Sequence, residues 1–283
     1  KSRMLMVLSP LQSECAGSGR PAMGKSAFAL NLAVHAAQTL MKPVLFFSLE
    51  MGKAELAQRI LSSEARVDSQ LLRTGRPGPN DWTKISHAVG RLDIPLIIDD
   101  SSGTSVVQIR AKARRTISRE GGLALIVIDY LQLMGGDGRP ENRQLEVSEI
   151  SRKLKLLARE FSVPILALSQ LSRQLEARTE KRPTLSDLRE SGALEQDADV
   201  VMMLHREAYY HKQDPNWLEA NPNRANVAEV IVAKQRNGPT GTVELMWDSS
   251  STAFRNLAAQ GMARGVEYVG RSESVAEYGD IPA

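Results

Sequence analysis

The stretch that decides the fold is Gly19-Arg20-Pro21-Ala22-Met23-Gly24-Lys25-Ser26. It matches the pattern G-x-x-x-x-G-K-[ST] at every fixed position, and a helical pattern over residues 27–40 follows directly. The two glycines allow a close approach of the backbone, so that successive N–H groups line a concave site for an anion. The stretch therefore predicts a phosphate-binding loop for a nucleoside triphosphate, with a glycine-rich turn that merely caps a helix as the alternative.

The end of this stretch supplies the charged and polar groups that such a site needs. Lys25 carries a compact positive charge for the outer phosphates, and Ser26 offers a hydroxyl ligand to Mg²⁺. The following helix adds the positive end of its dipole. The predicted nucleotide-binding residues are Gly19, Arg20, Pro21, Ala22, Met23, Gly24, Lys25, Ser26 and Ala27.

The composition is that of an ordinary globular chain with one large core. Of the 283 residues, 42% are apolar and 24% are charged, which suits a single large α/β domain. The net charge of +3 gives no general argument for nucleic acid, so any such binding must come from local basic clusters. The single cysteine excludes an intrachain disulfide, and no apolar run has membrane-spanning length. We therefore expect a cytoplasmic protein with no membrane contact.

Short apolar runs alternate with helical patterns along most of the chain. The runs at 44–49, 94–98, 123–128, 163–168 and 200–204 predict buried strands, and residues 54–65, 106–119 and 145–161 predict helices between them. This order predicts an α/β fold with a mainly parallel central sheet flanked by helices. Residues 228–236 and 242–247, joined by a turn-rich link, predict an antiparallel C-terminal hairpin.

The polar residues that close the predicted strands are the next candidates. They are Glu50, Asp99, Asp129 and Gln170. In an open parallel sheet the ligand sits beyond the carboxyl ends of the strands. Asp129 fits the carboxylate that holds Mg²⁺, Glu50 fits a general base, and Gln170 fits a hydrogen-bond sensor of the γ-phosphate. Each also has a structural alternative: a turn cap, a helix cap or a satisfied strand end.

Later strings resemble the ATPase domain of the bacterial replicative DNA helicases, the DnaB family. In the family's order, and together with the phosphate loop, they are Phe47-Ser48-Leu49-Glu50-Met51, Ile128-Asp129-Tyr130-Leu131-Gln132, Leu168-Ser169-Gln170-Leu171, Asp187-Leu188-Arg189-Glu190-Ser191-Gly192, Glu195-Gln196-Asp197-Ala198-Asp199 and Lys234-Gln235-Arg236-Asn237-Gly238. The resemblance covers about residues 19–257. It implies a RecA-like P-loop NTPase fold, ATP and Mg²⁺ as cofactors, and a hexameric ring around single-stranded DNA.

Carried over residue by residue, the resemblance agrees with the roles given above. It makes Lys25 and Ser26 the phosphate and Mg²⁺ ligands, Asp129 the second metal anchor, Glu50 the catalytic base and Gln170 the γ-phosphate sensor.

The resemblance adds two further groups of candidates. It implies that Lys234 and Arg236 reach the nucleotide of a neighbouring subunit, although their spacing alone equally suits an exposed hairpin. It also implies that Arg189, with backbone N–H groups near Glu190 and Gly192, holds DNA phosphates. Without it, residues 186–187 would simply cap a short helix with surface charges. The polar residues 135–143 suit either a loop facing the DNA or a plain connector.

The family's activity is translocation on single-stranded DNA in the 5′ to 3′ direction and duplex unwinding in replication, and this polarity rests on the resemblance alone. Two departures limit the comparison. The apolar run 4–8 is separated from Gly19 by the polar residues 9–18, so the first strand either starts early or has been lost. The family's amino-terminal helical domain and linker helix are absent from the sequence, which leaves primase and a helicase loader as uncertain partners.

We divide the chain into an atypical segment 1–18, an ATPase domain 19–260 and a flexible tail 261–283. Two other functions remain open. One is a RecA-like recombinase-type ATPase, against which the strings after residue 186 argue. The other is an ATP-binding interaction module with little turnover, which DNA-stimulated hydrolysis would exclude.

Overall fold

The computed structural model describes residues 3–9, 23–135, 143–171, 174–257 and 267–268, and for 8, 9, 143, 144, 174, 176, 189–191, 267 and 268 it describes the backbone alone. A 10-stranded sheet forms the centre, in the order β10-β8-β7-β6-β1-β5-β4-β2-β3, with β9 paired to β8. The strands are β1 Met4–Ser9, β2 Val44–Ser48, β3 Leu96–Asp99, β4 Leu125–Asp129, β5 Ile165–Gln170, β6 Val200–His205, β7 Val227–Gln235, β8 Gly241–Asp248, β9 Ala253–Asn256 and β10 Glu267–Tyr268. β6, β1, β5, β4, β2 and β3 pair in parallel, and β7, β8, β9 and β10 pair antiparallel. The predicted α/β class with a C-terminal antiparallel hairpin is confirmed.

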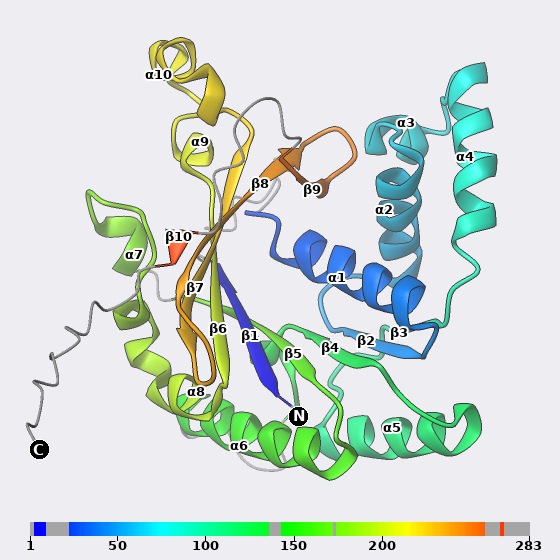
Figure 1. Ribbon diagram of the computed structural model, residues 1–283, viewed down its shortest axis with the longest axis vertical. Helices are drawn as coiled ribbons and strands as arrows, with labels where there is room; N and C mark the ends of the chain where they lie inside the picture. The colour runs from blue at the N-terminus through cyan, green and yellow to red at the C-terminus, as the bar shows by residue number, and fades with distance from the viewer. Residues whose placement is uncertain (1–2, 10–22, 136–142, 172–173, 258–266, 269–283) are drawn as a thin grey trace, which may run out of the picture.

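Helices cover both faces of the sheet (Figure 1). The α-helices are α1 Lys25–Leu40, α2 Lys53–Ala65, α3 Ser69–Thr74, α4 Pro79–Arg91, α5 Val106–Glu120, α6 Arg143–Phe161, α7 Gln174–Ala177, α8 Gly192–Asp197, α9 Glu207–Tyr210 and α10 Pro215–Ala220. Three 3₁₀ helices accompany them: η1 Leu131–Leu133, η2 Leu185–Ser191 and η3 Pro222–Arg224. Within the described ranges, no helix combines the length and the apolar character needed to cross a membrane.

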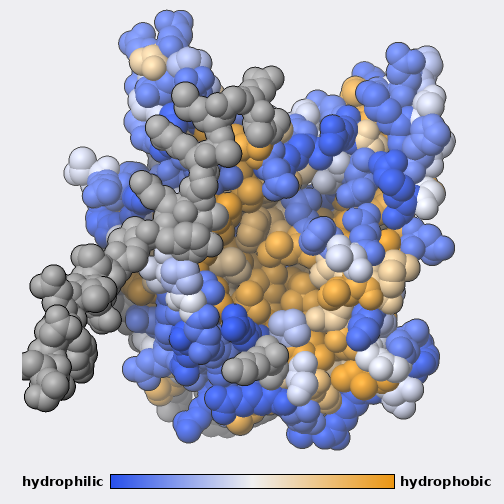
Figure 2. Space-filling model, in the orientation of Figure 1, coloured by the Kyte–Doolittle hydropathy of each residue, from blue (hydrophilic) through white to orange (hydrophobic). Residues whose placement is uncertain are grey.

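Two apolar layers hold the helices to the sheet. Successive strand residues point to opposite faces. In β2, Leu45 and Phe47 therefore join the layer under α5 and α6, whereas Val44 and Phe46 join the layer under α1. On the face shown in Figure 2, hydrophobic residues gather in the middle of the molecule, and hydrophilic residues cover the two projections that carry α4 and α10.

The first apolar run forms the centre of the sheet. β1 lies between β5 and β6, with Met4 opposite Ile165 and Leu5 opposite Val200. Of the two readings of the amino-terminal segment, the structure therefore shows the early strand, and residues 4–9 belong to the same sheet as the rest of the domain. The polar segment that follows lies outside the described residues from position 10 to 22.

The predicted strands and helices are present, with small shifts at their ends. β3 begins at Leu96 rather than at residue 94, because Pro95 has no N–H to donate to the ladder, although its carbonyl accepts from Val44 N at 2.8 Å. Among the elements that no sequence pattern predicted are α3, α4 and β9. α4 has a recognisable start, since Asp81 accepts a hydrogen bond from Gly78 N at 3.2 Å and a proline occupies its first turn.

Candidate nucleotide site

The site is built around the start of α1, which follows the central strand. Gly24 precedes the helix with a φ of 95°, in the region that favours glycine, and its carbonyl accepts from Phe28 N at 2.8 Å. Met23, Gly24, Lys25, Ser26 and Ala27 are described, whereas Gly19, Arg20, Pro21 and Ala22 lie outside the described residues. The helix begins at Lys25, two residues before the predicted start at residue 27.

Lys25 is held inside the protein rather than extended into water. Its side chain is 6% exposed, and its Nζ lies 4.6 Å from the centroid of the Tyr130 ring. Burial lowers the pKa of Lys25 below its usual value, and the negative charges of Asp129 and Glu50 oppose that shift. A bound phosphate would supply the further negative charge that this buried ammonium group lacks.

Asp129 is the buried acid of the site. It closes β4, is 0% exposed, and neither of its carboxylate oxygens has a hydrogen-bond partner among the described residues. Burial raises the pKa of Asp129, and the positive charge of Lys25 opposes this rise. The nearby Ser26 hydroxyl also opposes it, although the distance and angles between this hydroxyl and the Asp129 carboxylate are not those of an ordinary hydrogen bond. A buried carboxylate without a partner is costly, so this position suits a ligand or an ion that would satisfy it.

The donor atoms here fit Mg²⁺. A carboxylate and a hydroxyl are oxygen ligands of the kind that Mg²⁺ prefers, and this ion usually takes only one or two protein ligands beside phosphates and water. In the part of the chain that the structure describes, no group of three or more His, Cys, Asp or Glu side chains surrounds a common point. Ser26 and Asp129 could therefore hold the ion only together with phosphate oxygens and water.

Glu50 stands at the carboxyl end of the neighbouring strand. It follows β2 and lies in a turn fixed by Ser48, whose Oγ donates to the carbonyl of Met51 at 2.6 Å. Although the residue is largely exposed, burial of its carboxyl group and the charge of Asp129 raise the pKa of Glu50, while Lys25 opposes the rise. A raised pKa is expected of a carboxylate that accepts a proton from water.

Gln170 and Asp99 end two other strands of the sheet, and only Gln170 remains a candidate for the site. Gln170 ends β5, is partly buried and lies opposite Ser9 of β1. Asp99 is not part of the cluster, because Lys112 donates to its carboxylate at 2.6 Å and Ser101 N donates at 3.0 Å. Burial acts to raise the pKa of Asp99, but these bonds hold it at about 2, so its structural role outweighs a site role.

Two residues of the site were not among the predicted ones. Tyr130 packs its ring against Lys25, and the peptide bond that joins Asp129 to Tyr130 is cis. Arg59 of α2 bonds Glu55 at 2.9 Å, and its charge opposes the raised pKa values of Glu50 and Asp129. The only available sequence signal was indirect: Tyr130 directly follows the predicted metal ligand.

Lys234 and Arg236 point together toward α8, as their spacing of two predicts. Lys234 Nζ donates to the carbonyl of Glu195, and Arg236 donates to the carbonyl of Gln196 and pairs with Asp199 at 3.6 Å. Burial lowers the pKa of Lys234, and the charge of Arg236 lowers it further. β6, β1 and β5 separate β7 from β4, which at about 4.8 Å per strand places these residues about 19 Å from Asp129 across the sheet.

The predicted DNA-binding segment forms η2 and the start of α8. Asp187 accepts from Thr184 N at 2.7 Å and pairs with Arg178 at 3.1 Å, so it caps η2. The side chains of Arg189 and Glu190 lie outside the described residues. Gly192 is exposed at the start of α8. Most of the polar loop after residue 135 also lies outside the described residues.

The chain matches a known protein family over most of its length. The family model described as the DnaB-like helicase C terminal domain matches residues 15–256. The chain belongs to this family. The resemblance read from the strand-end strings is therefore confirmed.

Relatives of this DnaB-like domain are about 50% identical to it in sequence. The Replicative DNA helicase DnaB of Geobacillus stearothermophilus is 51% identical over 242 residues, covering 85% of this chain and 51% of the relative. That of Leifsonia xyli is 52% identical with the same coverage. The chain thus spans about half the length of the relatives it matches.

Two solved structures share the fold of the DnaB-like domain. One, described as an ATPase domain, has a TM-score of 0.79 at 39% identity, covering 90% of this chain and 85% of that one. A DnaB-like replicative helicase, studied for its interactions with primase, has a TM-score of 0.80 at 39% identity, covering 90% of this chain and 57% of that one. These likenesses confirm the RecA-like fold expected of the family.

Proposed function

We propose that this DnaB-like domain binds ATP with Mg²⁺ at the start of α1 and hydrolyses it to drive movement along single-stranded DNA during replication. The observation that carries the proposal is the buried carboxylate of Asp129, which has no hydrogen bond among the described residues and lies near Lys25 and Ser26. A site of this composition is suited to a hydrated cation bound to phosphate.

Each residue of the cluster has a separate role in the proposed reaction. Lys25 binds the outer phosphates, together with backbone N–H groups of the loop that ends at Gly24. Ser26 and Asp129 hold Mg²⁺, which when bound neutralises charge that develops on the phosphates. Glu50 orients the attacking water and accepts its proton, and Gln170 donates a hydrogen bond to the γ-phosphate.

Lys234 and Arg236 complete the site of a neighbouring subunit in this proposal. Their separation from Asp129 of the same chain, about 19 Å across the sheet, supports action between subunits rather than within one. An arginine supplied in trans makes hydrolysis depend on assembly, which a closed homohexameric ring provides.

The remaining parts of the proposal concern DNA and partners. Arg189 and the backbone near Glu190 and Gly192 bind DNA phosphates without reading bases, as a motor that passes every base requires. Movement is 5′ to 3′ and takes place in the cytoplasm. The solved relative described with its interactions with primase makes primase a candidate partner, and a helicase loader is a second one.

The test is steady-state ATP hydrolysis with Mg²⁺, with and without single-stranded DNA, over a range of protein concentrations. We expect DNA to stimulate turnover cooperatively with protein concentration. Lys25→Ala is expected to abolish turnover and leave the fold intact, while Lys42→Ala, which removes an exposed lysine beyond the other end of α1, should leave it unchanged. Normal hydrolysis by Lys25→Ala would refute the site, and no turnover by the wild type at any concentration would favour a binding module.

A further inference from the structure

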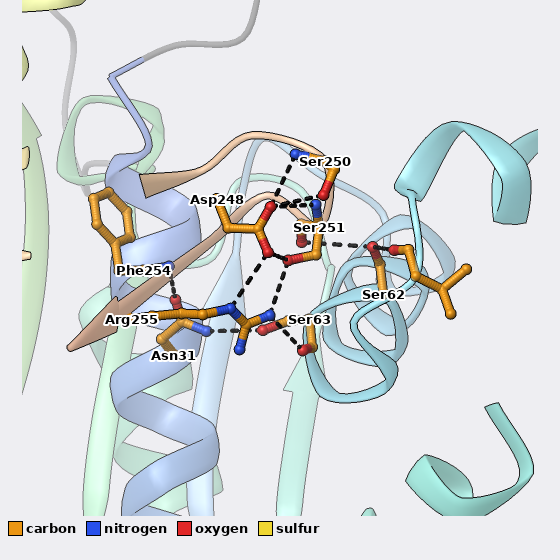
Figure 3. Close-up of polar contacts among 9 residues, drawn as sticks. Asn31, Ser62, Ser63, Asp248, Ser250, Ser251, Phe254 and Arg255 are labelled. Carbon is orange, nitrogen blue, oxygen red and sulfur yellow. Dashed lines mark hydrogen bonds and ion pairs between the residues drawn. The ribbon is translucent and has the colours of Figure 1, made fainter. Parts of the chain in front are cut away.

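The turn between β8 and β9 carries a polar network that no proposed catalytic role uses (Figure 3). Asp248 is its centre. One carboxylate oxygen accepts from Ser250 Oγ at 2.7 Å and from Ser251 N at 3.3 Å, and the other accepts from Ser251 Oγ at 2.6 Å and Arg255 Nε at 3.3 Å. Burial acts to raise the pKa of Asp248, but these hydrogen bonds hold it at about 2, so the carboxylate is charged at neutral pH.

The network ties this turn to two helices far away in sequence. Arg255 donates to the carbonyl of Ser63 in α2 at 3.1 Å. Asn31 of α1 accepts from Phe254 N at 2.9 Å and donates to Ser63 Oγ at 3.3 Å. Ser62 Oγ lies 3.5 Å from the carbonyl of Ser251, but it donates its single proton to the carbonyl of Val67 at 2.6 Å. Strand β9 is therefore fixed to both α1 and α2, as Figure 3 shows.

The strands held in this way place two aromatic rings against the phosphate loop. Trp247 is 2% exposed, and its ring centroid lies 4.8 Å from that of Phe254. Phe254 packs edge-on against Phe28 at 5.6 Å. A Cβ atom on Gly24 would lie 2.8 Å from Phe254 and 2.9 Å from Trp247, so these rings fill the space beside Gly24.

We propose that Asp248 and Arg255 are positioning residues for the nucleotide site: they hold β9 so that Phe254 and Trp247 fix the backbone at Gly24. Neither residue is among those proposed to bind the nucleotide. The inference rests on the proposed function, because its consequence is measured at the ATP site. A misplaced Gly24 would move the N–H groups and the Lys25 side chain that bind phosphate, and a shift of about 1 Å at a catalytic group costs on the order of 100-fold in rate.

The alternative is that the network only stabilises the fold. The two roles differ in what they change. Loss of positioning weakens nucleotide binding in protein that is still folded, whereas loss of a purely structural contact lowers the Tm and leaves the KM of the folded fraction unchanged.

The test uses Arg255→Met, which keeps an unbranched apolar stem and removes the guanidinium group with its charge and hydrogen bonds. Arg91→Met is the matched control, because Arg91 lines the same groove of about 840 Å³ as Arg255 but bonds Glu64 of α2 and His87 of its own helix. We expect Arg255→Met to raise the KM for ATP and the Kd for a fluorescent ADP about tenfold, with kcat within about twofold of the wild type. The value of kcat/KM then falls about tenfold, as expected of a displacement smaller than 1 Å. Arg91→Met should leave all three unchanged.

Amide hydrogen exchange without nucleotide gives an independent reading. Residues 24–28 should exchange faster in Arg255→Met, and Arg255→Lys should restore part of both effects, because lysine can pair with Asp248 but lacks the fork that also reaches Ser63. The same KM and exchange in Arg255→Met and wild type would overturn the proposal, as would an equal change in Arg91→Met. If Arg255→Met does not fold, Asp248→Asn must show the same changes or the proposal is refuted. A wild type that neither binds nor hydrolyses ATP would instead refute the proposed function, and the exchange comparison would still decide the positioning role.

Discussion

Replacing Gly24 with alanine tests the packing around the start of α1. The backbone at Gly24 has a φ of 95°, which costs an alanine about 1–3 kcal/mol. The new methyl group would also lie 2.8 Å from Phe254 and 2.9 Å from Trp247. Trp247 is buried and cannot turn away, so this overpacking adds about 1–3 kcal/mol. We therefore expect the free energy of unfolding to fall by about 2–6 kcal/mol, and Tm by roughly 5–20 °C.

Gly121→Ala separates the two contributions. Gly121 has a φ of 74°, and a Cβ atom there would meet nothing within 4 Å, so this variant has the backbone strain without the clash. The assay is urea unfolding of both variants, of Phe254→Leu and of the Gly24→Ala, Phe254→Leu double variant. Leucine removes the ring atoms that meet the new methyl group, so the double variant should be at least about 1 kcal/mol more stable than the sum of the single changes predicts. Additivity within about 0.5 kcal/mol, or equal losses in Gly24→Ala and Gly121→Ala, would refute the packing described here.

Three further predictions concern catalysis, pH and assembly. Glu50→Gln should lower kcat about 100-fold or more with nucleotide binding retained, since it removes the general base. Because the pKa of Glu50 is raised and the base works deprotonated, wild-type turnover should rise with pH through a value above the ordinary 4.5, and the residual turnover of Glu50→Gln should lack this rise. Asp248 has a pKa of about 2 when folded against 3.8 unfolded, so it stabilises the protein above about pH 4, and this stabilisation is lost as the pH falls toward 2. Asp248→Asn should therefore lose about 2 kcal/mol at pH 7 and show a flatter decline in acid, measured by urea unfolding; an unchanged acid slope would contradict the assignment. Finally, a mixture of Lys25→Ala and Arg236→Ala subunits should regain turnover that neither has alone, because some interfaces then join an intact Lys25 to an intact Arg236; no recovery in proven mixed rings would contradict action in trans.

Much of the proposed nucleotide site could be predicted from local patterns. The motif around Lys25 predicts phosphate binding directly, because a loop that surrounds phosphate needs glycines, lysine and serine at a fixed spacing. Glu50 and Asp129 could be found because each closes an apolar run, and parallel strands bring their carboxyl ends to one edge of the sheet. The same rule also selected Asp99, which the structure shows bonded to Lys112, because the rule identifies strand ends and not the partners of their side chains.

The sequence by itself determined the fold class, the family and the helix that follows the predicted phosphate loop. Each of these depends on residues that are neighbours along the chain or repeat with the period of a helix or strand. Only the tertiary structure decided that β1 lies in the middle of the sheet, that Asp129 has no hydrogen bond among the described residues, and that Phe254 packs against Gly24. Phe254 and Gly24 are far apart in the chain, and no local sequence pattern predicts which of many apolar side chains will pack against a given glycine. That choice is made by the packing of β9 on α1 and α2, which exists only once the whole chain has folded.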